Sequence, residues 1–128
     1  MSPRFPGAHD SYAARVEITK TYFMLPVQDM DRAVSFYRDA VGLALDFQSP
    51  FWSELRWHDA TVALHPGASG EERESWLGFH VADLDGAVTA LEHAGGHRRG
   101  NERAEGNARL QSVVDPDGNI LTLGQDGA

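Results

Sequence analysis

The side chains of this sequence that are best suited to chemistry are two histidines and a carboxylate, His65, His80 and Glu54. Two imidazoles and one carboxylate are a frequent ligand set for non-haem iron and for zinc. Glu54 could instead act as a general base, if burial raised the pKa of its carboxyl group. The two histidines lie far apart in the sequence, and each could simply form hydrogen bonds in a polar cavity. Both interpretations stay open.

A second group of candidates lies in and near the segment Trp52-Ser53-Glu54-Leu55-Arg56. Alternate residues of a strand point to one face, so Glu54 and Arg56 could together orient a polar or charged ligand. The alternative is a salt bridge inside the protein, or a register shifted by one residue, which would exchange the faces of the strand. Tyr22, Trp52 and Trp76 could stack on a planar or cationic ligand, or could only pack.

The elements that must position these residues are repeated along the chain. Val27-Gln28-Asp29-Met30-Asp31 recurs as Val81-Ala82-Asp83-Leu84-Asp85, a shift of 54 positions (81 − 27). The same shift relates Tyr22 to Trp76, aromatic to aromatic. Matches held at one offset indicate a duplicated supersecondary unit.

Each copy is predicted to fold as a strand, a helix and three further strands. Asp29 and Asp83 are suited to cap the two helices, and Gly42 and Gly95-Gly96 are suited to end them. The predicted strands are Ile18–Val27, Leu43–Gln48, Phe51–Trp57, Thr61–His65, Ser75–Val81, His97–Glu102, Arg109–Val114 and Asn119–Gly124, with a turn at Asp115-Pro116-Asp117-Gly118. The fold class is therefore α+β, with two tandem βαβββ units. The predicted boundaries are a flexible lead-in at 1–17, units at 18–66 and 75–124, a linker at 67–74 and a tail at 125–128.

The alternation of side chains divides the strands into two faces. One face is apolar, as expected beneath helices: Phe23, Leu25, Val27, Leu55, Trp57, Val62, Leu64, Leu77, Phe79, Val81, Leu121 and Leu123. The other mixes large aromatic residues with a few polar ones, as small-molecule sites do. We predict that this face lines a cavity whose ligand contacts are Tyr22, Met24, Trp52, Glu54, Arg56, His65, Trp76, His80 and Thr122. The alternative is that it packs against another subunit or against the other half.

Composition excludes several classes of function. The 128 residues carry 11 Lys and Arg against 19 Asp and Glu, a formal net charge of −8. This excess argues against binding to nucleic acid or to an anionic membrane surface. There is no cysteine, which excludes disulfides, thiolate nucleophiles and cysteine metal sites. No apolar run approaches the roughly 20 residues of a membrane span. We expect a soluble, cytoplasmic protein that acts on a small molecule.

The duplicated unit carries two further motifs, Val27–Tyr37 and Asp115-Pro116-Asp117-Gly118-Asn119. With them the chain, over about residues 18–124, resembles the vicinal oxygen chelate superfamily of glyoxalases, bleomycin-resistance proteins and extradiol dioxygenases. The resemblance implies that each unit curls its mixed sheet into a half-barrel and that paired units enclose a cavity. It also implies a homodimer, in which a unit of one chain often pairs with a unit of the other.

The resemblance also bears on metal binding. Many enzymes of the superfamily hold a divalent metal with His, Glu or Gln on the first and last strands of each unit. The corresponding positions here are Tyr22, Ala63, Trp76 and Thr122, and none is a usual ligand of such a metal. We therefore predict that the protein binds no metal and no other cofactor, and we assign no residue a catalytic role.

Three functional hypotheses follow. The first is metal-independent binding of a small aromatic or amphipathic molecule in the concave cavity. The second is a lyase, isomerase or dioxygenase-type enzyme of the superfamily, which would use a displaced metal or acid–base chemistry by Glu54 and His65. The third is a non-catalytic dimeric interaction protein whose cavity is filled by its own side chains.

Overall fold

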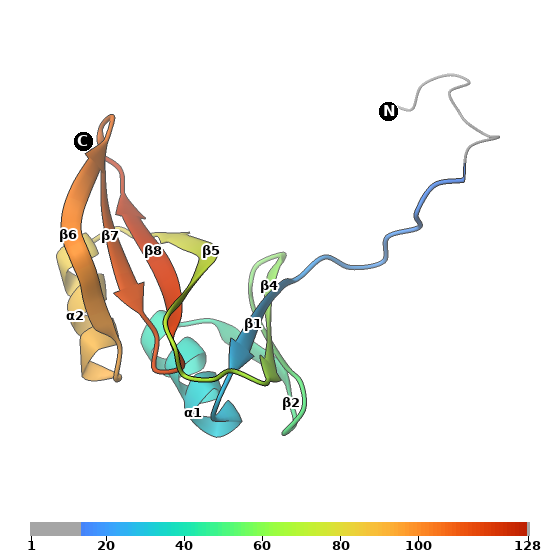
Figure 1. Cartoon of the computed structure of the whole chain (residues 1–128). Helices are drawn as coiled ribbons and strands as arrows, with labels where there is room; N and C mark the ends of the chain where they lie inside the picture. Colours follow the sequence, from blue (N-terminus) through green and yellow to red (C-terminus); the bar gives the residue numbers. More distant parts are fainter. Residues whose placement is uncertain (1–13, 128) are drawn as a thin grey trace, which may run out of the picture.

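The computed structural model describes residues 14–127, which form two four-stranded sheets and their helices (Figure 1). The strands are β1 (Phe23–Val27), β2 (Ala44–Gln48), β3 (Ser53–Trp57) and β4 (Ala60–Pro66) in the first sheet, and β5 (Arg73–His80), β6 (His97–Glu105), β7 (Ala108–Val114) and β8 (Asn119–Gln125) in the second. The helices are α1 (Met30–Ser35), η1 (Phe36–Val41) and α2 (Leu84–His93). None of the described helices is long and apolar enough to cross a membrane.

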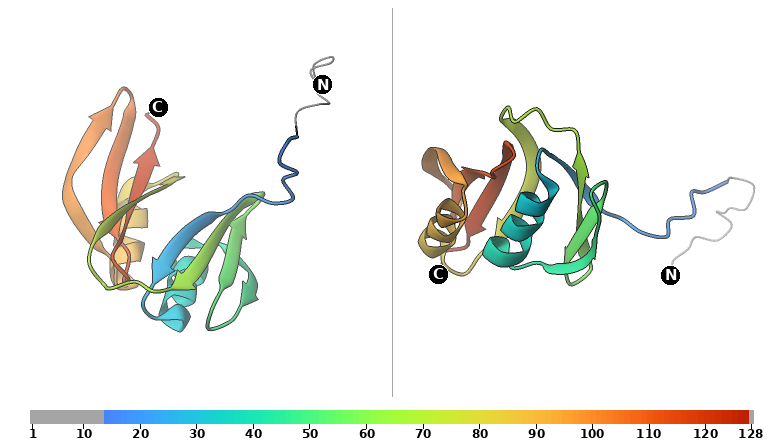
Figure 2. Two further views of the ribbon diagram at one scale, coloured as in Figure 1. Left: turned by 45° about the vertical axis from the view of Figure 1, so that its right-hand side comes forward. Right: turned by 90° about the horizontal axis from the view of Figure 1, so that it is seen from below.

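The two sheets have the same topology. Their strand orders are β1-β4-β3-β2 and β5-β8-β7-β6, and in each sheet the first and last strands of the unit pair in parallel while the other pairs are antiparallel. Two tandem βαβββ units are therefore confirmed, with the fold class α+β. The helices of the two units lie side by side, with α2 in contact with η1 (Figure 2, right).

The helices begin and end where the sequence predicts. The carboxylate of Asp29 accepts a hydrogen bond from the Arg32 N–H at 3.1 Å, and Asp83 accepts one from the Gly86 N–H at 3.1 Å, so both aspartates cap their helices. Gly42 ends the first helix with a φ of 95°, a left-handed conformation that glycine adopts without strain. The final turns of this helix, η1, have the wider π-helical hydrogen bonding, which the sequence pattern did not predict.

The predicted strand Ile18–Val27 is too long. β1 begins at Phe23, which pairs with Val62 of β4. In this parallel register residues 18–20 would run past Ala60, where β4 begins, and the ladder already stops at Phe23. The predicted lead-in falls mostly on residues 1–13, which lie outside the described residues, as does Ala128 of the predicted tail.

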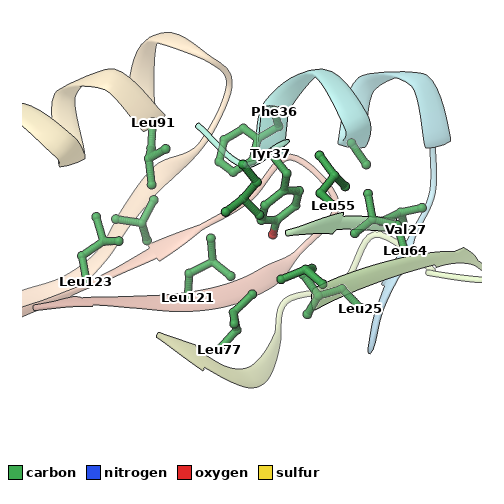
Figure 3. Packing of buried hydrophobic residues seen from close by; sticks show 14 of the residues in the cluster. Leu25, Val27, Phe36, Tyr37, Leu55, Leu64, Leu77, Leu91, Leu121 and Leu123 are labelled. Carbon is green, nitrogen blue, oxygen red and sulfur yellow. The ribbon is translucent and has the colours of Figure 1, made fainter. Parts of the chain in front are cut away.

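A single apolar core joins both units. Its labelled members in Figure 3 are Leu25, Val27, Phe36, Tyr37, Leu55, Leu64, Leu77, Leu91, Leu121 and Leu123. The predicted apolar faces of both sheets thus turn toward the helices and toward each other. Phe23 and Trp57, which lie at strand ends, are exceptions, because they are 37% and 61% exposed.

A buried polar network also joins the units, through the loop between β7 and β8. Asp115 Oδ2 accepts a hydrogen bond from the Tyr37 hydroxyl at 2.5 Å and another from Asn119 Nδ2 at 3.0 Å. Asp115 Oδ1 accepts from the backbone N–H groups of Asp117 and Asn119, both at 2.8 Å. Burial, and then the charge of Asp115, raise the pKa of the Tyr37 hydroxyl well above its ordinary value of 10.0.

Asp117 connects the same loop to the start of α1. Its Oδ1 accepts hydrogen bonds from the N–H groups of Gln28 at 2.8 Å and Asp29 at 3.2 Å. The Arg32 guanidinium donates to the same oxygen at 2.8 Å. The Asp117 side chain is fully buried, whereas that of Arg32 is 44% exposed. The predicted turn therefore also supplies the polar contacts that connect the two units.

Candidate functional site

Three aromatic rings and a carboxylate from the first unit form a cluster, which we call the aromatic–carboxylate cluster: Tyr22, Trp52, Glu54 and His65. The ring centroids of Tyr22 and Trp52 are 5.5 Å apart and meet edge to face, at 86°. Trp52 and His65 are stacked, with centroids 6.4 Å apart and planes at 17°. The indole N–H of Trp52 donates to Glu54 Oε2 at 2.7 Å. These residues were predicted from the sequence, and the structure brings them together.

The turn between β2 and β3 positions Trp52. The Ser49 hydroxyl accepts a hydrogen bond from the Trp52 backbone N–H at 3.0 Å and donates to the Trp52 carbonyl at 2.9 Å. Glu54 then lies in β3 opposite Ala63 of β4, a small residue that is fully buried beneath the cluster face. The turn therefore fixes the backbone of Trp52, and the bond to Glu54 then holds its indole.

Lys20 is a member of this site that sequence reasoning missed. Its ammonium group forms an ion pair with Glu54, whose side chain is only 18% exposed. The hydrogen bond from Lys20, and then the one from Trp52, lower the pKa of the Glu54 carboxyl below its ordinary value. Glu54 could act as a general base only if its pKa were raised. The structure shows the opposite shift. The signal for Lys20 was its spacing of two residues from Tyr22, which places both on one side of an extended chain.

Arg56 and Met24 flank the cluster face. Arg56 does not pair with Glu54; its Nε donates to Asp46 of β2 at 2.9 Å. Both of these side chains are partly exposed, so the pair contributes little to stability. Met24 is 51% exposed, on the edge strand of the first sheet.

The remaining predicted contacts lie on the second sheet. Trp76 is 81% exposed, and His80 Nδ1 lies 3.5 Å from Asp126. Thr122 is half-buried in β8 and pairs with Gly78 of β5. Within residues 14–127 we find no hydrogen bond, ion pair or ring contact that connects these three residues to the aromatic–carboxylate cluster. The predicted ligand contacts therefore fall into two separate groups, one on each sheet.

The described part of the chain gathers no group of three His, Asp or Glu side chains that could hold a metal ion. In particular, His65 stacks on Trp52 while His80 approaches Asp126, so Glu54, His65 and His80 do not converge in the single chain. The residues that the structure offers at the predicted metal positions supply an aromatic ring, a methyl group or a hydroxyl, and these do not fit a catalytic divalent ion.

An apolar groove of about 520 Å³ lies between the two units, on the core side of the sheets. Its walls include Phe23 and Trp57 of the first sheet and Phe79 and His80 of the second. Phe23 and Trp57 were predicted to be buried in the core, and their exposure at this groove corrects that prediction. The groove is distinct from the aromatic–carboxylate cluster, which lies on the opposite face of the first sheet.

The chain also matches a known protein family in sequence. A model of the Glyoxalase/Bleomycin resistance protein/Dioxygenase superfamily matches residues 20–123. No curated protein matches the chain in sequence.

Solved structures with the same fold include proteins of different activity. The fosfomycin resistance protein FosX from Listeria monocytogenes matches with a TM-score of 0.70 at 16% identity, over 86% of this chain and 94% of that one. The bleomycin-binding protein of Streptomyces verticillus, solved with copper(II)-bleomycin, gives 0.63 at 19% identity, over 89% and 100%. A glyoxalase/bleomycin resistance protein/dioxygenase family enzyme from Burkholderia phytofirmans PsJN gives 0.69 at 16% identity, over 82% and 96%. At these identities the likeness shows the fold alone.

Proposed function

The chain belongs to the glyoxalase/bleomycin resistance protein/dioxygenase superfamily, and on this premise we propose that it binds a small aromatic or amphipathic molecule without using a metal ion. The observation that carries the proposal is the aromatic–carboxylate cluster. Stacked and edge-on rings beside an ionised carboxylate are suited to a flat ring system that bears a positive charge or a hydrogen-bond donor.

The contacts of Glu54 support this choice of ligand. Glu54 is held by the Trp52 indole and is balanced by Lys20, which lies on a segment without regular structure. A ligand cation would compete with the Lys20 ammonium for the same carboxylate, while its ring contacts Trp52 or Tyr22. One protein of similar fold was solved with copper(II)-bleomycin, so binding of a small molecule has a precedent on this scaffold.

Binding is favoured over acid–base catalysis by the electrostatics of the site. A general base works best when its pKa lies near the working pH. The lowered pKa of the Glu54 carboxyl keeps it ionised and makes it a weaker base. An ionised carboxylate remains an effective anchor for a cation.

We further propose that the protein acts as a homodimer in the cytoplasm. In one chain three large members of the predicted ligand contacts are open to water: Met24 is 51%, Tyr22 45% and Trp76 81% exposed. Large apolar side chains exposed in this way favour contact with a partner or a ligand. A second copy that covers these faces would convert two open half-sites into a closed cavity.

The first test is tryptophan fluorescence in titrations with proflavine, a planar aromatic cation. We expect Trp52→Ala to weaken proflavine binding about tenfold, since losing one aromatic wall removes roughly 1 to 1.5 kcal/mol. The matched control is Trp57→Ala, because Trp57 is also exposed but lines the groove on the other face. Equal loss in both variants, or no quenching of the unaltered protein by proflavine and by neutral and anionic planar compounds, would contradict the proposal.

The second test is elemental analysis of protein purified without chelator. We expect far less than one equivalent of Fe, Mn, Ni or Zn per chain, because the available side chains do not form a ligand set. Treatment with EDTA should leave the affinity for proflavine unchanged. A stoichiometric metal that is lost in His65→Ala would establish the displaced-metal alternative instead.

A further inference from the structure

Trp76 is held in a backbone conformation that large side chains avoid. Its φ is 64°, in the left-handed region, whereas only His58 among the other described non-glycine residues has a positive φ. His58 lies in a hairpin turn, where such angles are common, but Trp76 lies inside β5. A bulky residue with positive φ is strained, and such strain persists only where surrounding contacts maintain it.

The strain arises from a bulge in the pairing of β5 with β8. Glu74 pairs with Ile120 and Gly78 pairs with Thr122, so β5 advances by four residues while β8 advances by two. Gly78 consequently takes the place beside Thr122 that Trp76 would take in a regular ladder. Trp76 is lifted out of the sheet and is 81% exposed, while its neighbour Leu77 stays in the core at 9%. Bulges of this kind redirect a side chain.

Glu74 stabilises the bulge through its side chain. Its Oε1 accepts hydrogen bonds from two consecutive backbone N–H groups, those of Ser75 at 3.2 Å and Trp76 at 3.1 Å. Ser75 fixes the other side of the bulge: its hydroxyl donates to the Ile120 carbonyl at 2.6 Å and accepts from the Leu77 N–H at 3.2 Å. The conformation of Trp76 is therefore maintained by contacts on both sides of it.

We propose that Glu74 is a positioning residue, which holds the β5 bulge so that the Trp76 indole forms an aromatic wall of the ligand site. The inference rests on the proposed function, since it assigns Trp76 to the site for a planar ligand. Gly78 lies two residues after Trp76 on the same edge strand and presents no side chain next to the indole. The alternative is that the bulge only blunts the edge of the sheet.

The variant Trp76→Gly distinguishes an aromatic wall of the ligand site from a bulge that only blunts the edge of the sheet. Glycine adopts a φ of 64° without strain, and little burial is lost from an 81% exposed side chain, so we expect the melting temperature to rise by roughly 2–5 °C. The affinity for proflavine should fall about tenfold in the same variant. Unchanged affinity in Trp76→Gly would show that Trp76 is no wall of the site and that the bulge serves the sheet edge.

Glu74 is tested by comparing Glu74→Ala with Glu74→Gln. The glutamine keeps an oxygen acceptor for the two N–H groups, so it should retain wild-type affinity for proflavine, whereas the alanine should lose as much affinity as Trp76→Gly. A readout independent of ligand is the near-ultraviolet circular dichroism of Trp76 in a Trp52→Phe/Trp57→Phe background. There Glu74→Ala should lose the signal of an ordered indole and Glu74→Gln should keep it.

The outcomes distinguish failure of the inference from failure of the proposed function. If Glu74→Ala keeps both the dichroism and the affinity, Glu74 does not position Trp76. If the unaltered protein does not bind proflavine or the other planar compounds, the proposed function fails, and the wall assignment of Trp76 fails with it. The dichroism then still decides whether Glu74 orders the indole.

Discussion

Replacing Asp115 with alanine is expected to lower the free energy of unfolding by about 3–5 kcal/mol, enough to unfold a large share of a marginally stable domain at physiological temperature. The Asp115 carboxylate is 2% exposed and accepts four hydrogen bonds. Its removal leaves the Tyr37 hydroxyl and the N–H groups of Asp117 and Asn119 buried with no acceptor in this network. An unmatched buried donor loses more than the net contribution of the bond it made.

The loss should affect both units at once. Asp115 lies in the second unit and Tyr37 in the first, so the variant loosens the joint between them rather than one sheet. Urea denaturation followed by circular dichroism at 222 nm, and separately by tryptophan fluorescence, would measure it. Asp46→Ala is the matched control, because Asp46 is also a paired carboxylate but is partly exposed, and we expect a loss of less than about 1 kcal/mol there. Equal losses in the two variants would show that the buried network does not hold the units together.

The helices and the layering of the fold could be predicted from the sequence because their determinants are local. Asp29 and Asp83 cap their helices with their own carboxylates, and Gly42 takes a left-handed angle that few other residues adopt. Strand alternation then assigned the faces correctly for the central residues, such as Leu25 and Leu121, which are fully buried.

Alternation failed where burial depends on another element. Phe23 and Trp57 have the parity of the core, but they lie at strand ends and line an open groove between the units, so they stay partly exposed. The start of β1 was predicted too early for a related reason: residues 18–22 have suitable types for a strand, but the ladder with β4 begins only at Phe23, and residues 18–20 would run past the start of β4. Residue type indicates a preference for strand, whereas a neighbouring strand is needed to form it.

The candidate site was predictable as a set of residues but not as an arrangement. Parity placed Tyr22, Trp52, Glu54 and His65 on one face, and the structure brings these four into contact. It could not show that Arg56 pairs with Asp46, or that Lys20 pairs with Glu54 and lowers the pKa of its carboxyl, whereas a general base would need a raised pKa. Those contacts depend on the direction of individual side chains.

The second half of the predicted site shows a further limit. Trp76 was assigned by the 54-residue repeat as the equivalent of Tyr22, but a bulge that the repeat does not encode lifts it out of the sheet. The bulge is held by the side chains of Glu74, which accepts from the backbone of the next two residues, and of Ser75, which bonds to Ile120 and Leu77. A conformation of this kind depends on a few local side-chain contacts, and the pattern of residue types along the strand is the same with or without them.

The buried tyrosine gives the protein a stability that decreases at alkaline pH. Burial and the neighbouring Asp115 raise the pKa of the Tyr37 hydroxyl well above 10.0, its ordinary value and the value expected in the unfolded chain. The folded state therefore retains this proton where the unfolded state loses it. The contribution of Tyr37 is complete below pH 10 and is lost as the pH rises above 10, at up to about 1.4 kcal/mol per pH unit.

Tyr37→Phe tests this expectation, because phenylalanine keeps the ring in the core and has no proton to lose. At pH 7 we expect it to cost about 1–2 kcal/mol, since the Asp115 oxygen loses one donor but keeps Asn119. Between pH 10 and 12 the free energy of unfolding of Tyr37→Phe should fall less steeply than that of the unaltered protein, so that the two converge. Tyr22→Phe, which changes a 45% exposed tyrosine, should keep the steep fall. Parallel curves for the unaltered protein and Tyr37→Phe would mean that the alkaline sensitivity comes from other groups and that the Tyr37 proton is not held by the fold.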